Sequence, residues 1–522
     1  MSTITSLTAS EIARKIRAGE LSAREVIDAH IRRIEEVNPA LNAVVIPLFE
    51  QARQEAEAAD AAQRRGDPLG PLHGVPITIK EQFLVKDTAT SYGLTHQKDH
   101  RAAEDGPLVK RLRDAGAIIL GKTNTSQLLV YIESDNDLYG RSNNPWNLER
   151  TPGGSSGGEA AIIASGGSPL GLGGDVGGSI REPAHFCGIQ GLKPTAGRLT
   201  NFDSRPGFFS WGLMEAMPPQ AGPMARSVDD LALAMDVLAA PGLERMDPSV
   251  PPVPWPDWKD VSISGLRIAM VTDDGYFQAS PAIRRVVSEA GEALSKQGAH
   301  VELWSPPDVS EAMRFFFGFF TADNFNGLRS ALGPDKPAPQ IRGSLQSTKM
   351  PAPMKKFVAG MMRNSGQVRL ARILTQAGGR STEVYWKLLE ERNAYRLRFI
   401  GAMEAGGFDA IICPPTSLPA VTHGSTANLP DFDSYARLFN VLGMPAGVVA
   451  ASRVRAGEES DRPSSKDPVD QAAAQVEKGS AGLPVGVQVA ARHWREDVVL
   501  AVMSALESHF SSQADYPARP PI

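Results

Sequence analysis

Two short glycine-rich segments that contain serine constrain this chain more than any other feature. The first is Gly153-Gly154-Ser155-Ser156-Gly157-Gly158, and the second is Gly174-Asp175-Val176-Gly177-Gly178-Ser179-Ile180-Arg181. Glycine beside serine lets the backbone approach a substrate closely and adopt dihedral angles that other residues avoid. The successive N–H groups of the second segment can meet the negative charge that develops on oxygen when a nucleophile attacks a carbonyl carbon. The two segments therefore predict acyl transfer by a serine.

A serine hydroxyl is a weak nucleophile on its own, so the chain also needs a base. None of the nine histidines lies in a sequence context that pairs it with these serines. A short β-strand that ends in a lysine is predicted for residues 74–80, GVPITIK. Burial can lower the pKa of a lysine such as Lys80 by up to ~3–5 units, which would make its neutral amine available as a base. The alternative is a lysine that ends the strand and points to water, as most lysines do.

Lys80 and the two glycine-rich segments, taken together, resemble the amidase signature family. The order of the three elements and their spacing, 75 residues from Lys80 to Ser155 and 24 more to Ser179, agree with the family pattern. The resemblance is dense from about 72 to 236 and returns at 440–446 and 482–490. It implies a Ser–cisSer–Lys triad. In that triad Ser179 is the nucleophile, Ser155 is a bridging serine preceded by a cis peptide bond, and Lys80 is the base.

The same resemblance implies roles for residues around the triad. The oxyanion would be bound by four successive backbone N–H groups, those of Val176, Gly177, Gly178 and Ser179. Position 176 is often threonine in the family, but only its backbone is needed. Asp175 and Arg181 can pair across the turn and hold it rigid, so we expect a structural rather than a catalytic role for both. Ser156 is expected to support the site in the same way.

Residues 134–198 look especially similar to the fatty acid amide hydrolase branch of the family, notably SGGSPLGLG at 165–173 and FCGIQGLKP at 186–194. That branch implies that residues 129–132 lie near the acyl chain, with Leu129 and Tyr131 as substrate-binding residues. The implied substrate is a small-molecule amide, ester or carbamate with an apolar or aromatic acyl group. The resemblance implies neither a metal nor an organic cofactor.

Other interpretations of the same residues remain open. The sequence GAIILGKT at 116–123 satisfies the P-loop spacing, but its centre is an apolar β-like run after a predicted helix, which is the wrong order. Residues 153–157 satisfy the Gly-x-Ser-x-Gly pattern, which would make Ser155 the nucleophile of an α/β-hydrolase-type esterase, although no strand is predicted before it. The chain could also be the glutamine-hydrolysing subunit of a multi-protein amidotransferase, or a binding protein that has lost activity.

Composition excludes several other classes of function. A net charge of −5 offers no excess of positive charge to attract nucleic acid, so we expect no nucleic-acid partner. No run approaches the ~18 apolar residues that a membrane span needs, and the N-terminus has no apolar core suited to a signal peptide. The two cysteines, Cys187 and Cys413, lie in apolar segments and are expected to be buried thiols. We therefore expect a cytoplasmic enzyme without a membrane anchor, which could form a homodimer.

The pattern along the chain predicts an α/β fold, a single large α/β/α sandwich around a mixed twisted sheet that spans 1–522 as one domain. Helices are expected within residues 1–66, beginning at Thr8-Ala9-Ser10-Glu11, a capping-box pattern. Residues 308–405 are expected to form a mainly helical cap inserted within the domain, and 453–479 a mobile surface loop. The cap contains Phe315–Phe320 and methionines that could be core or could line an apolar route to the site.

Overall fold

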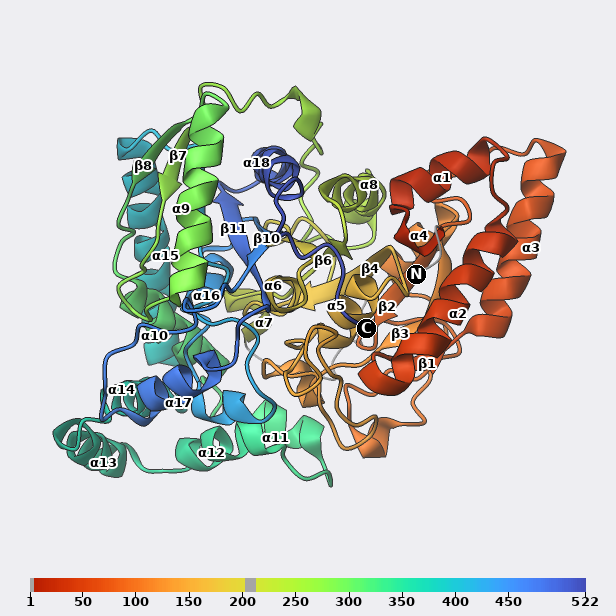
Figure 1. The fold of residues 1–522 in the computed structure, drawn as a ribbon. Coiled ribbons are helices and arrows are strands. Elements are labelled where there is room, and N and C mark those ends of the chain that lie inside the picture. The colour runs from red at the N-terminus through yellow and green to blue at the C-terminus, as the bar shows by residue number, and fades with distance from the viewer. Residues whose placement is uncertain (1–3, 202–212) are drawn as a thin grey trace.

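The sheet at the centre of the molecule contains strands from nearly the whole chain. A computed structural model describes residues 4–201 and 213–522. In that part of the chain, eleven strands form one sheet in the order β1-β3-β2-β4-β6-β5-β10-β11-β9-β7-β8, and helices flank it (Figure 1). The strands are β1 (Val44–Pro47), β2 (Pro76–Lys80), β3 (Ile118–Thr123), β4 (Leu170–Asp175), β5 (Gln190–Lys193), β6 (Gln220–Ala225), β7 (Arg267–Met270), β8 (His300–Leu303), β9 (Ala410–Cys413), β10 (Ala446–Arg453) and β11 (Pro484–Ala491).

Pairing within the sheet is mixed, as the sequence predicts. Strand β2 runs parallel to β3 and β4, and β7 runs parallel to β8 and β9. The other neighbouring strands are antiparallel. Every residue of β2, β3 and β4 is buried, which is typical of strands that are covered on both faces. The predicted α/β sandwich around a mixed sheet is confirmed.

Eighteen α-helices surround the sheet in the described ranges. They are α1 (Ala9–Arg17), α2 (Ala23–Leu41), α3 (Phe49–Arg65), α4 (Pro107–Asp114), α5 (Gly157–Ala164), α6 (Arg181–Cys187), α7 (Leu213–Ala216), α8 (Val228–Leu238), α9 (Pro281–Lys296), α10 (Val309–Phe320), α11 (Asn326–Leu332), α12 (Pro339–Thr348), α13 (Ala352–Asn364), α14 (Val368–Gln376), α15 (Thr382–Ala405), α16 (Ser434–Leu442), α17 (Pro468–Glu477) and α18 (Glu496–Phe510). Among the helices of residues 4–201 and 213–522, none combines the length and the apolar character that crossing a bilayer demands.

The N-terminal helices begin where local sequence signals place them. Thr8 and Glu11 form a reciprocal capping box at the start of α1, and Ser22 and Glu25 form another at α2. Each box satisfies two N–H groups that the first helical turn leaves without partners. Figure 1 places α1, α2 and α3 near the β1 end of the sheet and α9 beside β7 and β8 at the other end. The predicted capping box of α1 is therefore confirmed.

Residues 308–405 contain six helices, α10 to α15. On α10, Phe315, Phe316 and Phe317 are buried within the main apolar cluster of the molecule. On α13, by contrast, Met354 and Met361 are 54% and 52% exposed. The phenylalanine run is therefore mainly core packing, and these two methionines face solvent rather than an enclosed route.

Residues 453–479 are only partly the loop that the sequence suggests. The chain is irregular from 454 to 467 and then forms α17. Arg462 pairs with Glu477 at 2.9 Å, and both side chains are nearly or fully buried. Arg285 on α9 pairs with Glu458 at 2.9 Å. The first ion pair joins the irregular stretch to α17, and the second joins it to α9.

Candidate active site

Strand β2 carries Lys80 into the interior of the molecule. The lysine is the last residue of the strand, and its side chain is fully buried. Its Nζ donates hydrogen bonds to Ser155 Oγ at 2.7 Å and to the carbonyl oxygen of Gly174 at 3.2 Å. Burial lowers the pKa of Lys80 to about 7, although three nearby carboxylates act in the opposite direction. The neutral amine is therefore accessible near neutral pH.

Ser155 lies in a loop whose path depends on glycine. The Gly154–Ser155 peptide bond is cis. A Cβ on Gly154 would lie 2.5 Å from the backbone nitrogen of Glu133, and a Cβ on Gly158 would lie 2.6 Å from that of Asn124. Real Cβ atoms do not approach other atoms so closely, so any larger residue would push the loop away from the neighbouring backbone. The loop delivers Ser155 to Lys80 at the start of α5.

The second glycine-rich segment forms the turn between β4 and α6, and it brings Ser179 to the first segment. The N–H of Ser156 donates to the carbonyl oxygen of Ser179 at 3.2 Å. Gly178 has a φ of +118°, which residues with a side chain rarely adopt. The structure thus joins the three sequence elements that carry Lys80, Ser155 and Ser179.

The N–H groups of this turn fall into two sets. Within the described part of the chain, those of Val176, Gly177 and Ser179 have no hydrogen-bond acceptor. The N–H of Gly178 donates to Asp175 Oδ1 at 2.8 Å. Of the donors expected from the sequence, Val176, Gly177 and Ser179 are therefore available to a ligand, whereas Gly178 is engaged by Asp175.

Asp175 and Arg181 form a buried ion pair behind the turn. Arg181 Nε and Nη2 donate to the two carboxylate oxygens at 3.0 and 3.1 Å. Burial alone would raise the pKa of Asp175, but the Arg181 guanidinium lowers it far below the usual range of an aspartate. Arg181 also donates to Gln488 Oε1 at 2.7 Å and to Asn440 Oδ1 at 2.6 Å. The charged pair therefore ties the turn to β11 and α16, and its carboxylate stays ionised.

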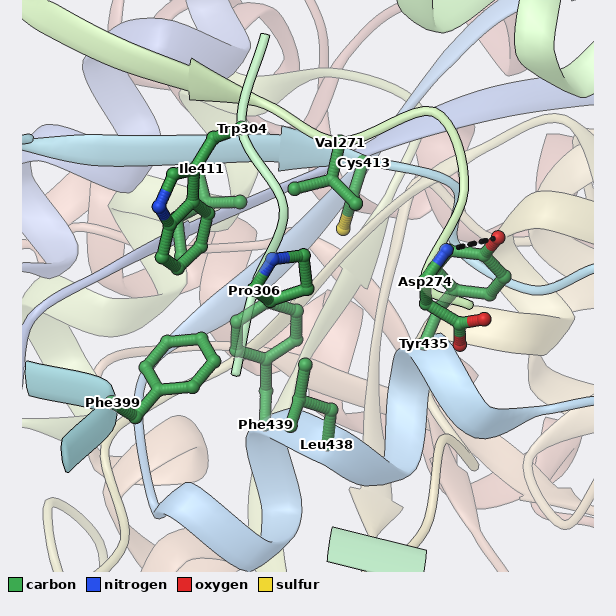
Figure 2. Close-up of a pocket in the computed structure, with 10 residues that line it drawn as sticks. All are labelled: Val271, Asp274, Trp304, Pro306, Phe399, Ile411, Cys413, Tyr435, Leu438 and Phe439. Carbon is green, nitrogen blue, oxygen red and sulfur yellow. Dashed lines mark hydrogen bonds between the residues drawn. The ribbon is translucent and has the colours of Figure 1, made fainter. Parts of the chain in front are cut away.

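Polar contacts continue away from the turn. Ser156 Oγ donates to the carbonyl oxygen of Gly174 at 3.2 Å. Gln488, which accepts from Arg181, donates in turn to Cys413 Sγ at 3.3 Å. Cys413 borders a small, largely apolar cavity (Figure 2), which is lined by Val271, Asp274, Trp304, Pro306, Phe399, Ile411, Cys413, Tyr435, Leu438 and Phe439. The cavity is thus connected to the turn through Gln488 and Arg181.

The segment expected to contact the acyl chain has an unusual backbone. Leu128 and Leu129 have φ values of +58° and +64°, a left-handed conformation that is uncommon for bulky residues. The Tyr131 ring is buried, and its hydroxyl is bonded to two backbone groups of its own loop. The Tyr131 carbonyl oxygen lies 2.7 Å from the point where Gly154 would carry a Cβ. This segment therefore packs against the Ser155 loop through its backbone.

Two side chains over the turn are absent from the sequence-based prediction of the site. A Cβ on Gly177 would lie 3.0 Å from Phe316 Cζ and 3.8 Å from Arg437 Cγ. The Arg437 guanidinium stacks on the Phe316 ring, 4.4 Å from its centroid, and pairs with Asp433 at 2.6 Å. The phenylalanine run indicated an apolar region, but no local signal could show which ring reaches the turn.

The alternative motifs do not form the structures that their proposed chemistry needs. The P-loop-like sequence is mostly strand β3, and the helix α4 comes before it rather than after it. Between β3 and β4 the described chain contains no strand, so none leads into Ser155 as in an α/β-hydrolase elbow. His185 is buried, and its ring nitrogens contact the carbonyl oxygen of Leu418 and the N–H of Gly486.

Known proteins match this chain, some of them over nearly its whole length. The family model described as Amidase matches residues 25–500. Fatty-acid amide hydrolase 1 from Sus scrofa is 33% identical over 502 residues, which cover 95% of this chain and 84% of that protein. A component of the glutamyl-tRNA(Gln) amidotransferase of Alkalilimnicola ehrlichii is 37% identical over 324 residues, which cover 62% of this chain and 65% of that protein. A solved structure of fatty acid amide hydrolase matches with a TM-score of 0.84 at 29% identity, covering 97% of this chain and 85% of that one.

Proposed function

The chain belongs to the amidase family and hydrolyses amides, and we propose that it does so through Lys80, Ser155 and Ser179. The observation that carries this proposal is the buried hydrogen bond from Lys80 Nζ to Ser155 Oγ. It links a lysine of lowered pKa to a hydroxyl group. A neutral amine in that position can act as a base, and the N–H of the adjacent Ser156 bonds the carbonyl oxygen of Ser179.

Proton transfer along these groups would make Ser179 nucleophilic. As Ser179 Oγ attacks the carbonyl carbon, its proton passes to Ser155 Oγ, and the proton of Ser155 passes to the neutral amine of Lys80. The C–N bond of the tetrahedral intermediate then breaks, and the proton returns by the same route to the departing amine. Water repeats the sequence on the acyl-enzyme and releases the acid. The three groups finish in their starting protonation states.

For the oxyanion we propose the free N–H groups of Val176, Gly177 and Ser179. The Gly178 N–H instead holds the turn in shape through Asp175. Loss of one donor of this kind typically raises the barrier by ~3–4 kcal/mol. Because all three donors belong to the backbone, valine at 176 serves as well as threonine.

For the substrate we propose a small amide, ester or carbamate with an apolar or aromatic acyl group. Phe316 lies against Gly177, and the Leu128–Tyr131 segment contacts the Ser155 loop through its backbone while its Leu128 and Tyr131 side chains join a small apolar cluster, so apolar residues lie near the reacting groups. All three substrate classes pass through a tetrahedral oxyanion, which the same turn can bind. The names of the fatty acid amide hydrolase relatives agree with an apolar acyl group.

We also propose that residues 1–522 act as one domain, with 308–405 as an insertion that covers the site. One apolar cluster that extends from Ala9 to Phe510 supports the first statement. The contact of Phe316 on α10 with the turn supports the second.

A second candidate function is glutamine hydrolysis for an amidotransferase. It is favoured by the likeness to a component of the glutamyl-tRNA(Gln) amidotransferase. Activity assays on the purified chain distinguish the two functions. Hydrolysis of acyl anilides without a partner, together with inactivity on glutamine, would exclude the amidotransferase function.

A fluorophosphonate probe tests the assignment of the nucleophile. We expect a covalent adduct on the peptide that contains Ser179, and we expect neither adduct nor acyl anilide hydrolysis from Ser179→Ala. An adduct on Ser155 or Ser156 would contradict the proposal and would support the esterase alternative.

A further inference from the structure

We propose that Glu159 is the counter-ion of Lys80, a positioning residue that stabilises the ammonium formed when Lys80 accepts a proton. The inference rests on the proposed role of Lys80 as the base. Glu159 does not contact the reacting serines in this proposal. It acts through the charge of its carboxylate on the proton that Lys80 receives.

Glu159 is a buried carboxylate with few partners. It lies in the first turn of α5, a helix whose residues are all buried and otherwise uncharged. Thr78 Oγ1 donates to Glu159 Oε1, and Thr123 Oγ1 donates to Oε2 at 2.6 Å. In the described chain, no lysine or arginine nitrogen forms a direct ion pair with it. Two neutral hydroxyl groups are thus the donors that hold a fully buried carboxylate, which is costly unless a cation lies nearby.

The two threonines place this carboxylate beside Lys80. Thr78 precedes Lys80 by two residues on β2, so both side chains point to the same face of the sheet. Thr123 is the register partner of Lys80 on the neighbouring strand β3. A carboxylate that bonds both hydroxyls therefore lies on the same face as Lys80 and next to it along the sheet.

The sheet is shaped to accept this carboxylate. Gly171 on β4 is the register partner of Thr78. A Cβ on Gly171 would overlap with Glu159 Oε1, so any other residue there would displace the carboxylate. The same helix follows directly from the loop that holds Ser155. The loop before α5 thus supplies the hydroxyl that bonds Lys80, and the first turn of α5 supplies the carboxylate beside it.

The other carboxylates near Lys80 already have cations of their own. Asp175 accepts two hydrogen bonds from Arg181. Burial raises the pKa of Glu81, and the positive charge of the nearby Lys122 opposes that rise. For Glu159, burial raises the pKa to about 7, and Lys80 is the one charged group that acts on it. Of the three carboxylates that act on the pKa of Lys80, Asp175 has the largest effect but is already paired with Arg181, whereas Lys80 is the cation that acts on Glu159 in the described chain.

Charged or titratable side chains also lie on the elements packed against α5. They are His30 and Arg33 on α2, Lys122 on β3, Asp175 on β4, Arg226 after β6, and Arg181, Glu182 and His185 on α6. None of them changes the pKa of Glu159 in the described chain. Charges interact strongly in an interior of low dielectric constant, so the charge of Lys80 lowers the pKa of Glu159 and the charge of Glu159 raises that of Lys80.

This pairing gives Glu159 a role in the proton transfer. The proton of Ser179 moves to Ser155, and the proton of Ser155 moves to Lys80, which becomes an ammonium. The Glu159 carboxylate lowers the energy of that ammonium and makes no bond in the step. The proton then leaves for the departing amine, and the carboxylate is unchanged.

The substitution Glu159→Gln tests this inference because it removes the charge and keeps the shape. We expect the acid limb of kcat/KM for an acyl anilide to move to lower pH by about one unit. Without the negative charge Lys80 loses its proton more easily, so the neutral base is present at lower pH. The same change makes Lys80 a weaker base, so the plateau should fall roughly tenfold. The pH dependence of fluorophosphonate labelling should shift in the same direction.

The matched control is Glu507→Gln. Glu507 is another largely buried carboxyl whose pKa burial raises to about 7, but it lies near Asp229 and Asp230 rather than Lys80. We expect the acid limb of kcat/KM in Glu507→Gln to coincide with that of the wild type. If Glu159→Gln does not fold, Thr123→Val replaces it, because loss of a hydroxyl donor disfavours the ionised Glu159 and should shift the limb in the same direction by a smaller amount.

Failure of the inference can be told apart from failure of the proposed function through Lys80→Met. One outcome is that the residual kcat/KM of Lys80→Met falls at acid pH just as that of the wild type does. In that case the acid limb of the pH profile does not report the titration of Lys80, and the proposed function is wrong. If Lys80→Met abolishes the limb while a folded Glu159→Gln leaves it unmoved, the role of Lys80 stands and the counter-ion inference is overturned.

Discussion

Lys80 Nζ lies 2.7 Å from Ser155 Oγ, and both groups are shielded from solvent. This relationship joins the end of a central strand to a loop at the start of α5. A lysine in bulk water would be protonated at neutral pH and could not accept a proton from a serine. The burial that lowers the pKa of Lys80 to about 7 is therefore what allows this contact to carry a proton in either direction.

The first prediction concerns the leaving group. Lys80→Ala should lose most activity on amides, because the departing amine must be protonated as the C–N bond breaks. Nitrophenyl esters should lose less, because their leaving group needs no proton. The measurement is the amide-to-ester ratio of kcat/KM in the wild type and the variant. Lys80→Arg should not restore amide hydrolysis, since guanidinium stays protonated at any usable pH. Near wild-type amide activity in Lys80→Arg would make Lys80 a structural charge.

The second prediction concerns pH and stability. Since the folded-state pKa of Lys80 is lowered, the folded protein binds fewer protons at this site than the unfolded chain between about pH 7 and the ordinary lysine pKa. The contribution of Lys80 to the free energy of unfolding therefore becomes more favourable as pH rises through that window. Lys80→Met should lose most amide hydrolysis and should raise the free energy of unfolding at pH 7 by about 1–2 kcal/mol, less than the full cost of burying Lys80 because Glu159 loses its cation. Urea denaturation at pH 7 and pH 9 measures the effect, and the gain should be smaller at pH 9. A variant that is less stable at both pH values would contradict this account.

The third prediction concerns the ion pair behind the turn. Asp175→Asn should cost about 3–5 kcal/mol of stability, because it leaves the buried Arg181 without its carboxylate. It should also reduce kcat by at least ~100-fold, since the Gly178 N–H and the shape of the oxyanion turn depend on Asp175. Asp114→Asn is the matched control, because Asp114 pairs with Lys110 on the surface and should cost less than about 1 kcal/mol. Equal losses in the two variants would exclude a special role for the buried pair.

The fourth prediction concerns substrate size. Phe316→Leu should change the relative kcat/KM across a series of acyl lengths, because the Phe316 ring lies against Gly177. Phe315→Leu should cost a similar ~1–2 kcal/mol of stability without changing the series, because Phe315 is fully buried in the core. The measurement is kcat/KM for anilides of increasing acyl length, with thermal unfolding in parallel. Identical length profiles in both variants would show that α10 does not border the acyl group.

Much of the fold could be predicted from local patterns. The capping box at Thr8 and Glu11 and the strand that ends at Lys80 are as predicted. The apolar run within 116–123 is a strand rather than a P-loop, also as predicted. Each of these features depends on residues that are close in the sequence, where hydrogen bonding and side-chain alternation decide the conformation. The expected loop at 453–479 contains α17, because a short helix can form where tertiary contacts such as Arg462–Glu477 hold it.

The surroundings of the site were harder to predict, because they depend on contacts between distant segments. No local pattern indicates that Phe316 and Arg437 lie over Gly177, since α10 and α16 are far from the turn in the sequence and meet it only through the tertiary fold. The engagement of the Gly178 N–H by Asp175 depends on the exact path of the turn. The buried Glu159 did carry a signal, a single charge in an otherwise apolar helix, which is rare unless the charge has a partner.

The sequence by itself determined the family and the local geometry that glycine permits around Ser155 and Ser179, and it predicted the reacting groups that we propose. Only the tertiary structure decided which carboxylate lies beside Lys80 without another cation and which ring covers the turn that carries Ser179. The reason is that electrostatic and packing partners are set by strand register and helix docking. The register that pairs Lys80 with Thr123 places Glu159 beside the lysine, and that pairing joins segments far apart in the chain.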